Sequence, residues 1–361
     1  MVDRQARFRG ALLGMAVGDA LGFPVHGRSR EFARTQVETV TEGLVRHESG
    51  FHPLGQISDD AQTALSVGAA IVECGRVDAR VVAEHLAPLW RDHIVVGSPP
   101  GTTRAMEDFI VGRTSVDNCG QPVGCITGDA LPRAIPIGLW CVETPEAVSA
   151  TARRCTAITH RDARVQAGAA GIAAAVAYVA GVEEVVLGVF IDRVAAAVGG
   201  FHGESADRIR DFPRLLSITE YRVFDEFSEY AARQSEGEPV AFGAGVPDDG
   251  LFQLLLSLYY FLKAPFDLAK ALRSALSVGG EVTTLCALVG GLAGAFLGES
   301  ALPNRLIEEV GASSQAVEIA DGLAAALDAS RGDASGDEMR DSEVDDASDG
   351  SAGSGAQVRV K

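Results

Sequence analysis

Lysine is nearly absent from this chain of 361 residues: of its 31 basic residues, only Lys263, Lys270 and Lys361 are lysine. Acidic residues number 49, and the formal net charge at pH 7 is −18. Such a surface repels nucleic acid phosphates, so we expect no nucleic-acid groove. Strong acidity with little lysine is typical of an acidic proteome in a salt-rich cytoplasm, and an arginine-rich, high-GC coding bias explains the scarcity of lysine equally well.

Long hydrophobic runs are also missing. No window reaches the roughly 18 uninterrupted apolar residues of a membrane span, and the N-terminus, MVDRQARFRG, lacks the apolar core of a signal peptide. The six cysteines never form the close pairs that zinc ribbons or redox dithiols require, so we interpret them as reduced, buried thiols. We therefore expect a cytoplasmic protein without a membrane partner.

Apolar residues make up 47% of the chain and recur mainly at helical spacing, as in Phe8, Leu12 and Met15. Alternating, strand-like runs are few and short. Helices are predicted over 58-74, 145-155, 164-182, 185-199, 250-263, 267-277 and 283-298. The pattern predicts an all-α fold, a compact multi-helix domain.

Glycines recur four residues apart in two predicted helices. Each row lies along one helix face, where glycine costs about 1 kcal/mol relative to alanine. We therefore predict close contact of backbones along the rows Gly10, Gly14, Gly18, Gly22 and Gly290, Gly294, Gly298.

The domain organisation follows from composition. Residues 1-328 are predicted to form the helical domain, in which the more polar and aromatic segment 200-240 is a surface excursion: a lid, or a plain loop-and-helix insertion. Residues 329-361 are acidic and rich in Ser and Gly, with almost nothing to bury. We predict that they are a disordered tail.

The first candidate for chemistry is Ser58-Asp59-Asp60, which follows a glycine-containing loop and opens a predicted helix. Three adjacent oxygen ligands can surround one hard cation such as Mg²⁺. The structural alternative is helix capping, with Ser58 as the N-cap and the two aspartates in the first turn.

The second candidate is the polar cluster GGEVTT at 279-284, which interrupts two apolar helices. Glu281, Thr283 and Thr284 again present oxygens at a helix start. An ordinary helix connection is the structural alternative.

Together these motifs resemble the ADP-ribosylglycohydrolases, a family that includes the hydrolase acting on ADP-ribosylated dinitrogen reductase. The likeness begins with FRGALLGMAVGDALGFPV, continues through ISDDAQTAL, and ends with ALSVGGEVTTLCALVGGLAGAFLG. Where this chain has Ser58-Asp59-Asp60, the family has a Thr-Asp-Asp motif, and where it has GGEVTT, the family usually has GGDTDT. The resemblance implies the family's all-α fold and two magnesium ions held by these two motifs.

Two further blocks, GDALPRAIPIG at 128-138 and ITHRD at 158-162, resemble loops that line the family's ADP-ribose pocket. For Arg133 the alternative is a surface or ion-paired arginine, and for His160 a helix-capping or core histidine. The resemblance implies a substrate-binding role for Asp19, His26, Thr127, Gly128, Asp129, Ala130, Arg133, His160 and Gly280.

The departures from the family pattern fall on the metal motifs. Ser58 replaces a threonine conservatively, whereas Glu281 and Thr283 stand where the family has two aspartates, and Thr284 matches. His26 stands where some members have a glutamate beside the metals. Because Thr283 removes a negative charge, at least one metal should bind weakly or be absent, and a looser shell of Ca²⁺ tolerates Glu281 better than Mg²⁺ does.

The activity implied by the resemblance is metal-dependent hydrolysis of an N- or O-glycosidic bond in an ADP-ribosylated substrate. Asp59 or Asp60 is the candidate catalytic base that orients water. The alternative is an impaired member that binds ADP-ribose or a related nucleotide without turnover. The oxygen ligands fit Mg²⁺, Mn²⁺ or Ca²⁺, and the sequence leaves the acceptor, the linkage and the oligomeric state open.

Overall fold

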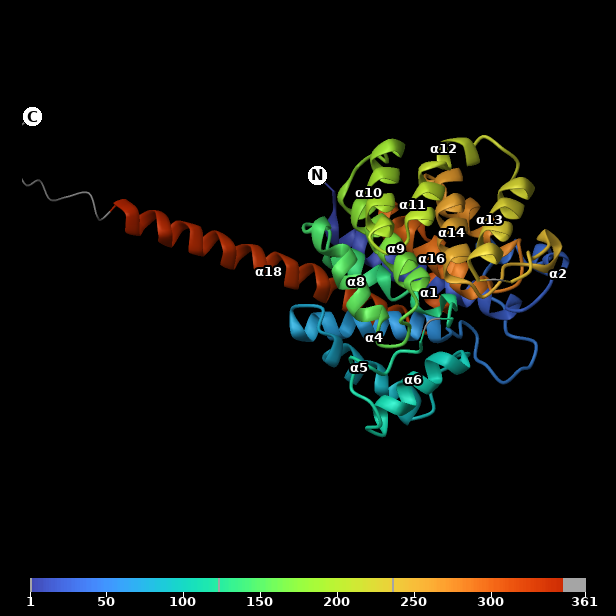
Figure 1. Ribbon diagram of the computed structural model, residues 1–361, viewed down its shortest axis with the longest axis horizontal. Helices are drawn as coiled ribbons and strands as arrows, with labels where there is room; N and C mark the ends of the chain where they lie inside the picture. The colour runs from blue at the N-terminus through green and yellow to red at the C-terminus, as the bar shows by residue number, and fades with distance from the viewer. Residues whose placement is uncertain (1, 123, 236, 347–361) are drawn as a thin grey trace, which may run out of the picture. The chain divides into compact units, whose positions relative to one another are not determined.

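The computed structural model describes residues 2–122, 124–235 and 237–346, with side chains described as far as residue 329. Figure 1 draws helices joined by loops through these ranges. In the same ranges β-structure is limited to two isolated bridges, Gln121 with His160 and Val246 with Gly280. The predicted all-α fold is confirmed.

Helices follow one another along the chain with short connections. The α-helices are α1 (Arg4–Gly22), α2 (Arg30–Arg34), α3 (Thr39–Glu42), α4 (Asp59–Cys74), α5 (Ala79–Arg91), α6 (Pro100–Ile110), α7 (Ala134–Trp140), α8 (Val148–Thr156), α9 (Ala163–Gly181), α10 (Leu187–Gly199), α11 (Gly203–Arg210), α12 (Phe212–Leu215), α13 (Glu220–Ser235), α14 (Gly250–Lys263), α15 (Leu268–Leu276), α16 (Val282–Leu297), α17 (Asn304–Glu309) and α18 (Ser313–Asp346). Short 3-10 helices are η1 (Phe23–Val25), η2 (Gly128–Ala130), η3 (Pro145–Ala147), η4 (Phe242–Ala244) and η5 (Glu299–Ala301). Each of the helices predicted from periodicity is present, with ends within three residues of the prediction.

Polar side chains define many of the helix starts. Asp249 accepts a hydrogen bond from the Phe252 backbone N–H at 2.9 Å at the start of α14, and Asp267 does the same for Lys270 in α15. Each carboxylate satisfies a first-turn N–H group that has no partner inside the helix. These local signals explain why the sequence predicted the helix boundaries closely.

The centre of the fold is the antiparallel pair α1 and α16. A Cβ atom added at Gly14 would lie 2.2 Å from the Gly290 carbonyl oxygen, and one at Gly294 would lie 1.9 Å from that of Gly10. Only glycine permits this approach of two backbones, so the predicted contact along both rows is confirmed. At the end of α1, a Cβ atom on Gly22 would lie 2.8 Å from the Cα of Thr283. The glycine rows thus bring the end of α1 to the start of α16.

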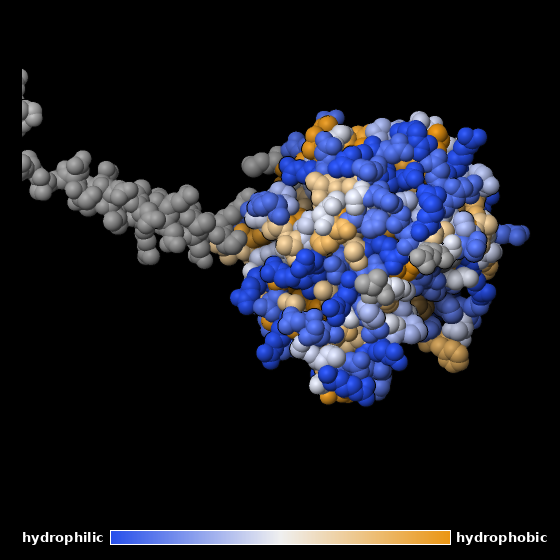
Figure 2. Space-filling view, in the orientation of Figure 1, coloured by the Kyte–Doolittle hydropathy of each residue, from blue (hydrophilic) through white to orange (hydrophobic). Residues whose placement is uncertain are grey.

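Helix α9 packs beside this pair, in contact with α7, α8, α10, α14 and α16. It is long and apolar enough to cross a membrane by length and composition alone, but 78% of its apolar window is buried inside the protein. Its hydrophobic length is therefore explained by its place in the core. Around the fold, Figure 2 shows a face on which hydrophilic residues predominate and hydrophobic ones are scattered, as the net charge leads us to expect.

In the segment predicted as a surface excursion, residues 200–235 and 237–240 are mostly helical. They contain α11, α12 and α13, and the side chains of Phe212, Phe224 and Phe227 are buried. The chain separates into two compact units, residues 1–324 and 325–361. Helix α18 is drawn as far as Asp346, and residues 347–361, the end of the predicted disordered tail, lie outside the described residues.

Candidate functional site

Asp19 joins the central helix α1 to the start of α4. Its side chain is fully buried, and its Oδ2 accepts hydrogen bonds from the backbone N–H groups of Ser58 at 2.9 Å and Ala61 at 3.0 Å. These two groups belong to the N-cap residue and the first turn of α4, so Asp19 fixes the position of the predicted metal motif. Its other oxygen, Oδ1, is buried without a hydrogen-bond partner.

The motif Ser58-Asp59-Asp60 caps α4 and also faces the neighbouring helices. The Ser58 hydroxyl accepts a hydrogen bond from the Asp60 backbone N–H at 3.3 Å, as an N-cap does. Asp60 Oδ2 accepts a hydrogen bond from the Thr284 hydroxyl at 2.9 Å, whereas its Oδ1 is buried and unpartnered. Capping is therefore present but does not account for Asp60, whose carboxylate is turned toward α16.

Three buried carboxylates, those of Asp19, Asp59 and Asp60, crowd this point. Burial raises the pKa of Asp60 well above its usual value, and the charges of Asp59 and Asp19 raise it further. The pKa of Asp59 is raised in the same way, by burial first and then by Asp129 and Asp19. Burial also raises the pKa of Asp19 to about 6, against the opposing hydrogen bonds from Ser58 and Ala61. Without a counter-charge these groups resist ionisation together.

The second predicted motif faces His26 instead. The Nδ1 atom of His26 lies 3.0 Å from the Thr283 hydroxyl, and its Nε2 atom lies 3.3 Å from a Glu281 carboxylate oxygen. Burial lowers the pKa of His26 and raises that of Glu281. Of the second motif, only Thr284 reaches the carboxylates of the first.

A third polar group lines the loop before α7. Asp129 accepts hydrogen bonds from the hydroxyls of Thr102 and Thr127, both at 2.6 Å. The Thr127 hydroxyl also lies 2.8 Å from Nε2 of the fully buried His160. Burial alone would raise the pKa of Asp129, but His160, Arg133 and the two hydroxyls together lower it. His160 is thus a core histidine held by polar partners.

Arg133 lies fully buried beside this group, so the surface alternative is wrong. It donates a hydrogen bond from Nη2 to the Thr159 hydroxyl at 2.6 Å, while its Nε and Nη1 have no hydrogen-bond partner in the described part of the chain. Its positive charge lowers the pKa of both Asp59 and Asp129. Arg133 therefore connects the third polar group electrostatically to the first motif.

Gly128 brings the third group against α14 and α16. A Cβ atom on Gly128 would lie 3.0 Å from Cγ of Gln253 and 3.6 Å from Cγ2 of Thr284. Its backbone N–H donates to Asp248 at 2.8 Å. Burial raises the pKa of Asp248 to about 7, although part of the residue is exposed to solvent. Residues 127–130 thus adjoin the carboxylate cluster.

Sequence reasoning missed Asp248 and Gln253. The pair Asp248-Asp249 reads as a turn, and Asp249 does cap α14, which leaves Asp248 free to accept from Gly128. Gln253 is fully buried and donates to the Glu281 carbonyl oxygen at 3.0 Å, while its Oε1 has no partner. A glutamine inside a helix as apolar as α14 was the available signal.

Gly280, predicted to contact substrate, has a structural role in the loop before α16. Its φ is +76°, and a Cβ atom would lie 2.4 Å from backbone atoms of Val246. Its N–H donates to the Arg28 carbonyl oxygen at 2.8 Å, and its own carbonyl oxygen accepts from Gly27 at 3.0 Å. No backbone donor of Gly280 remains for a ligand.

The first motif fits a hard cation. Asp19 and Asp60 each have a buried, unpartnered oxygen, and the hydroxyls of Ser58 and Thr284 lie at the same point, a donor set that Mg²⁺ and Ca²⁺ prefer. The second motif does not fit, because Glu281 and Thr283 face His26. Within the described residues, no three His, Cys, Asp or Glu side chains already form a metal-binding group.

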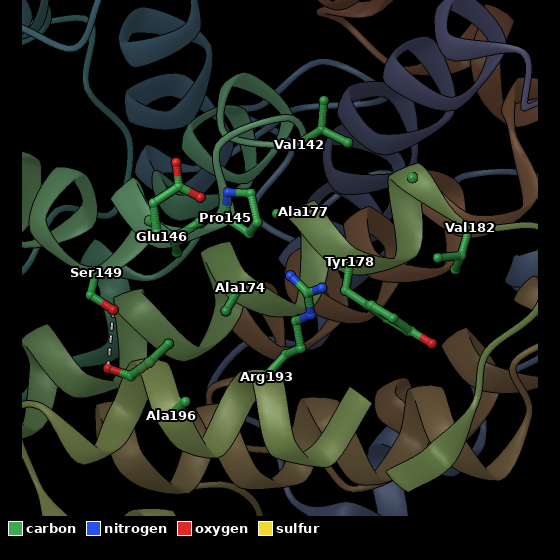
Figure 3. Close-up of a pocket in the computed structure, with 13 residues that line it drawn as sticks. Val142, Pro145, Glu146, Ser149, Ala174, Ala177, Tyr178, Val182, Arg193 and Ala196 are labelled. Carbon is green, nitrogen blue, oxygen red and sulfur yellow. Dashed lines mark hydrogen bonds between the residues drawn. The ribbon is translucent and has the colours of Figure 1, made fainter. Parts of the chain in front are cut away.

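A separate cavity of about 560 Å³ lies between α8, α9 and α10. Figure 3 shows Arg193 and Tyr178 at this cavity, over a floor that includes Ala174 and Ala177. None of its lining residues belongs to the motifs described above. Its walls have none of the clustered buried carboxylates, and we do not include it in the candidate site.

Two known proteins are similar to this chain in sequence. Over 310 residues the chain is 26% identical to a protein of Archaeoglobus fulgidus described as uncharacterized, covering 84% of this chain and 91% of that one. It is 33% identical over 95 residues to the ADP-ribosyl-[dinitrogen reductase] glycohydrolase of Rhodospirillum rubrum, covering 23% of this chain and 28% of that enzyme.

A solved structure described as an ADP-ribosylglycohydrolase-related protein complex superposes with a TM-score of 0.63 at 20% identity, covering 89% of this chain and 98% of the other. At that identity the likeness shows the shared fold. The family model for ADP-ribosylglycohydrolase matches residues 1–334, which is most of the sequence. The chain belongs to the ADP-ribosylglycohydrolase family.

Proposed function

We propose that this protein is a metal-dependent hydrolase that cleaves the N- or O-glycosidic bond between ADP-ribose and an acceptor. Family membership supports a glycohydrolase-type activity. The observation that carries the proposal is the burial of Asp19, Asp59 and Asp60 at one point, where α1, α4 and α16 meet. Burying three carboxylates together is costly, and a bound cation offsets that cost.

The residues that would hold the cation are Ser58, Asp59, Asp60 and Thr284. They offer oxygen only, so Mg²⁺, Mn²⁺ and Ca²⁺ are the candidates. A divalent cation supplies a Lewis acid and a template for the ribose hydroxyls. The hydrogen bond between Thr284 and Asp60, at 2.9 Å, holds two of these ligands together across two helices.

Asp59 is the better candidate for the base that orients water. Asp60 already accepts from Thr284 and lies 3.5 Å from the Ser58 hydroxyl, so one of its oxygens is engaged. The Asp59 carboxylate instead lies under the influence of Arg133 and Asp129 as well as the other aspartates. When ionised, this carboxylate can accept a proton from a water that attacks an oxocarbenium-like centre.

The wall of the proposed pocket is the loop that contains Thr127, Gly128 and Asp129. Both oxygens of Asp129 already accept hydrogen bonds, from the hydroxyls of Thr102 and Thr127. We therefore assign Asp129 to positioning the loop and not to binding the substrate. The lack of a side chain at Gly128 lets this loop approach Thr284. We assign ADP-ribose to the space beside this loop.

The test is release of ADP-ribose from an ADP-ribosylated protein, with metal-stripped enzyme and added Mg²⁺ or Mn²⁺. Asp59→Asn is expected to lower kcat at least about 100-fold, because it removes a carboxylate proposed both as the base and as a cation ligand while the side chain keeps its shape. The matched control is Asp207→Asn, since Asp207 has a side-chain exposure of 78% and lies on α11. If wild-type protein binds ADP-ribose tightly but does not cleave it from the ADP-ribosylated protein, the hydrolase proposal is wrong and the protein is an ADP-ribose-binding protein.

A further inference from the structure

The positions that depart from the family's metal motifs lie against one another. His26 follows η1, and Glu281 and Thr283 lie at the start of α16, yet the two His26 ring nitrogens lie 3.0 Å from Thr283 and 3.3 Å from Glu281. The close approach of Gly22 to Thr283 brings them together. The three departures therefore form one local arrangement.

This arrangement uses the oxygens that a second cation would need. Both nitrogens of His26 face protein groups, so the Thr283 hydroxyl and one Glu281 oxygen have partners. Around the first motif, by contrast, two carboxylate oxygens, Asp19 Oδ1 and Asp60 Oδ1, are buried without hydrogen-bond partners. The buried carboxylate oxygens without partners, those of Asp19 and Asp60, thus lie in one half of the site.

The distribution of charge also distinguishes the first motif from the second. Two dications in a two-metal site lie about 3.5–4 Å apart and repel each other strongly, so they need negative charge between them. Thr283 contributes none where the family pattern has a carboxylate, and an imidazole at position 26 contributes none in either protonation state. Among the residues of the second motif, Glu281 alone carries a carboxylate.

We infer that this protein binds one divalent cation, at the oxygens of Ser58, Asp60 and Thr284 with Asp59, and that His26 closes the position of a second cation by contacting Thr283 and Glu281. The inference rests on the proposed function for the existence of a cation. It adds the number of cations, one per chain, and a positioning role for His26, which holds the side chains of Thr283 and Glu281 in place.

The experiment counts Mn²⁺ bound to the metal-stripped protein, from the loss of the free-ion signal in electron paramagnetic resonance and from elemental analysis after gel filtration. We expect one ion per chain for wild type. The double variant His26→Glu/Thr283→Asp, which adds two carboxylates, is expected to bind two ions and to show the spectrum of a spin-coupled pair. The matched control His26→Gln/Thr283→Asn adds no charge and should still bind one.

Two ions on the wild-type chain would overturn the inference and leave the hydrolase proposal standing, because ADP-ribose release is measured separately. One ion without release would support the inference and remove the proposed function. No bound ion would overturn both. If the charged double variant shows a native melting transition but still binds one ion, the role given to His26 is wrong, and the wild-type count does not depend on that variant folding.

Discussion

Asp60, in the first turn of α4, accepts a hydrogen bond from Thr284, in the first turn of α16, at 2.9 Å. The two residues are 224 positions apart in the chain. Both helix starts are fixed on α1, one through Asp19 and the other through the glycine rows. The contact therefore depends on the arrangement of three helices and couples the cation ligands to the core.

Replacing Thr284 with valine tests this coupling. Thr284→Val keeps the shape but removes the donor to a buried carboxylate, so we expect a loss of about 1–3 kcal/mol in unfolding free energy. Cation affinity should fall about tenfold or more, because Asp60 loses its positioning partner. Titration calorimetry with Mg²⁺ and chemical denaturation measure the two effects.

Thr283→Val is the matched control, the same substitution one residue earlier. The Thr283 hydroxyl lies against His26 and not against Asp60, so cation affinity should change little. An equal loss of affinity in both variants would contradict the distinction between the two threonines.

The stability of the metal-free protein should fall as the pH rises. Asp19 has a pKa of about 6 in the folded state against about 3.8 for an ordinary aspartate, so the folded state binds more protons between these values. Its stabilising contribution is complete below about pH 4 and is lost as the pH rises through 6, a change of about 3 kcal/mol. The pKa values of Asp59 and Asp60 are raised as well, so these two carboxyls add to the loss of stability as the pH rises.

Asp19→Asn isolates that contribution, since asparagine resembles the protonated carboxyl and can accept from Ser58 and Ala61. In urea denaturation of metal-free protein, we expect the variant to be more stable than wild type near pH 8 and to show a shallower dependence on pH. Added Mg²⁺ should stabilise wild type more than the variant. A pH dependence identical to that of wild type would show that Asp19 is not the responsible group.

The contact of α1 with α16 should tolerate no side chain at Gly14. A Cβ atom there would lie 2.2 Å from a backbone oxygen of Gly290, and backbone cannot move aside as a side chain can. We expect Gly14→Ala to destabilise the protein by about 3 kcal/mol or more, measured by thermal and urea unfolding. The control is Gly188→Ala in α10, where an added Cβ atom would meet nothing within 4 Å beyond its own turn of helix, and it should be neutral or stabilising by up to about 1 kcal/mol.

Removing the buried guanidinium of Arg133 should take away a positive charge that acts on both Asp59 and Asp129, although His160 still lies beside Asp129. We expect Arg133→Leu to cost about 3–5 kcal/mol near pH 8 and less near pH 5, where the carboxyls can bind protons. Thr159→Val removes the hydrogen bond to Arg133 and the 3.0 Å contact of the same hydroxyl with His160 Nδ1, and it should cost about 1–2 kcal/mol. Equal losses for Arg133→Leu at the two pH values would mean that packing, not charge, gives Arg133 its importance.

The sequence by itself determined the helices and much of their packing. Helical spacing of apolar residues and capping groups such as Ser58 and Asp249 act over a few residues, so they can be read directly from the chain. The glycine rows can also be recognised locally, because a four-residue repeat places the glycines on one helix face. Close packing of another backbone against that face explains why side chains are missing there. The motifs also indicated where oxygen ligands gather.

Only the tertiary structure decided which of those ligands face one another. Thr283 and Thr284 are adjacent in sequence, yet successive residues of a helix point about 100° apart, so one meets His26 and the other meets Asp60. Asp248 lies beside Gly128 because α14 starts there, and no spacing in the sequence predicts that. Long-range burial likewise sets the raised pKa of Asp19, because desolvation depends on what the whole fold places around a carboxylate.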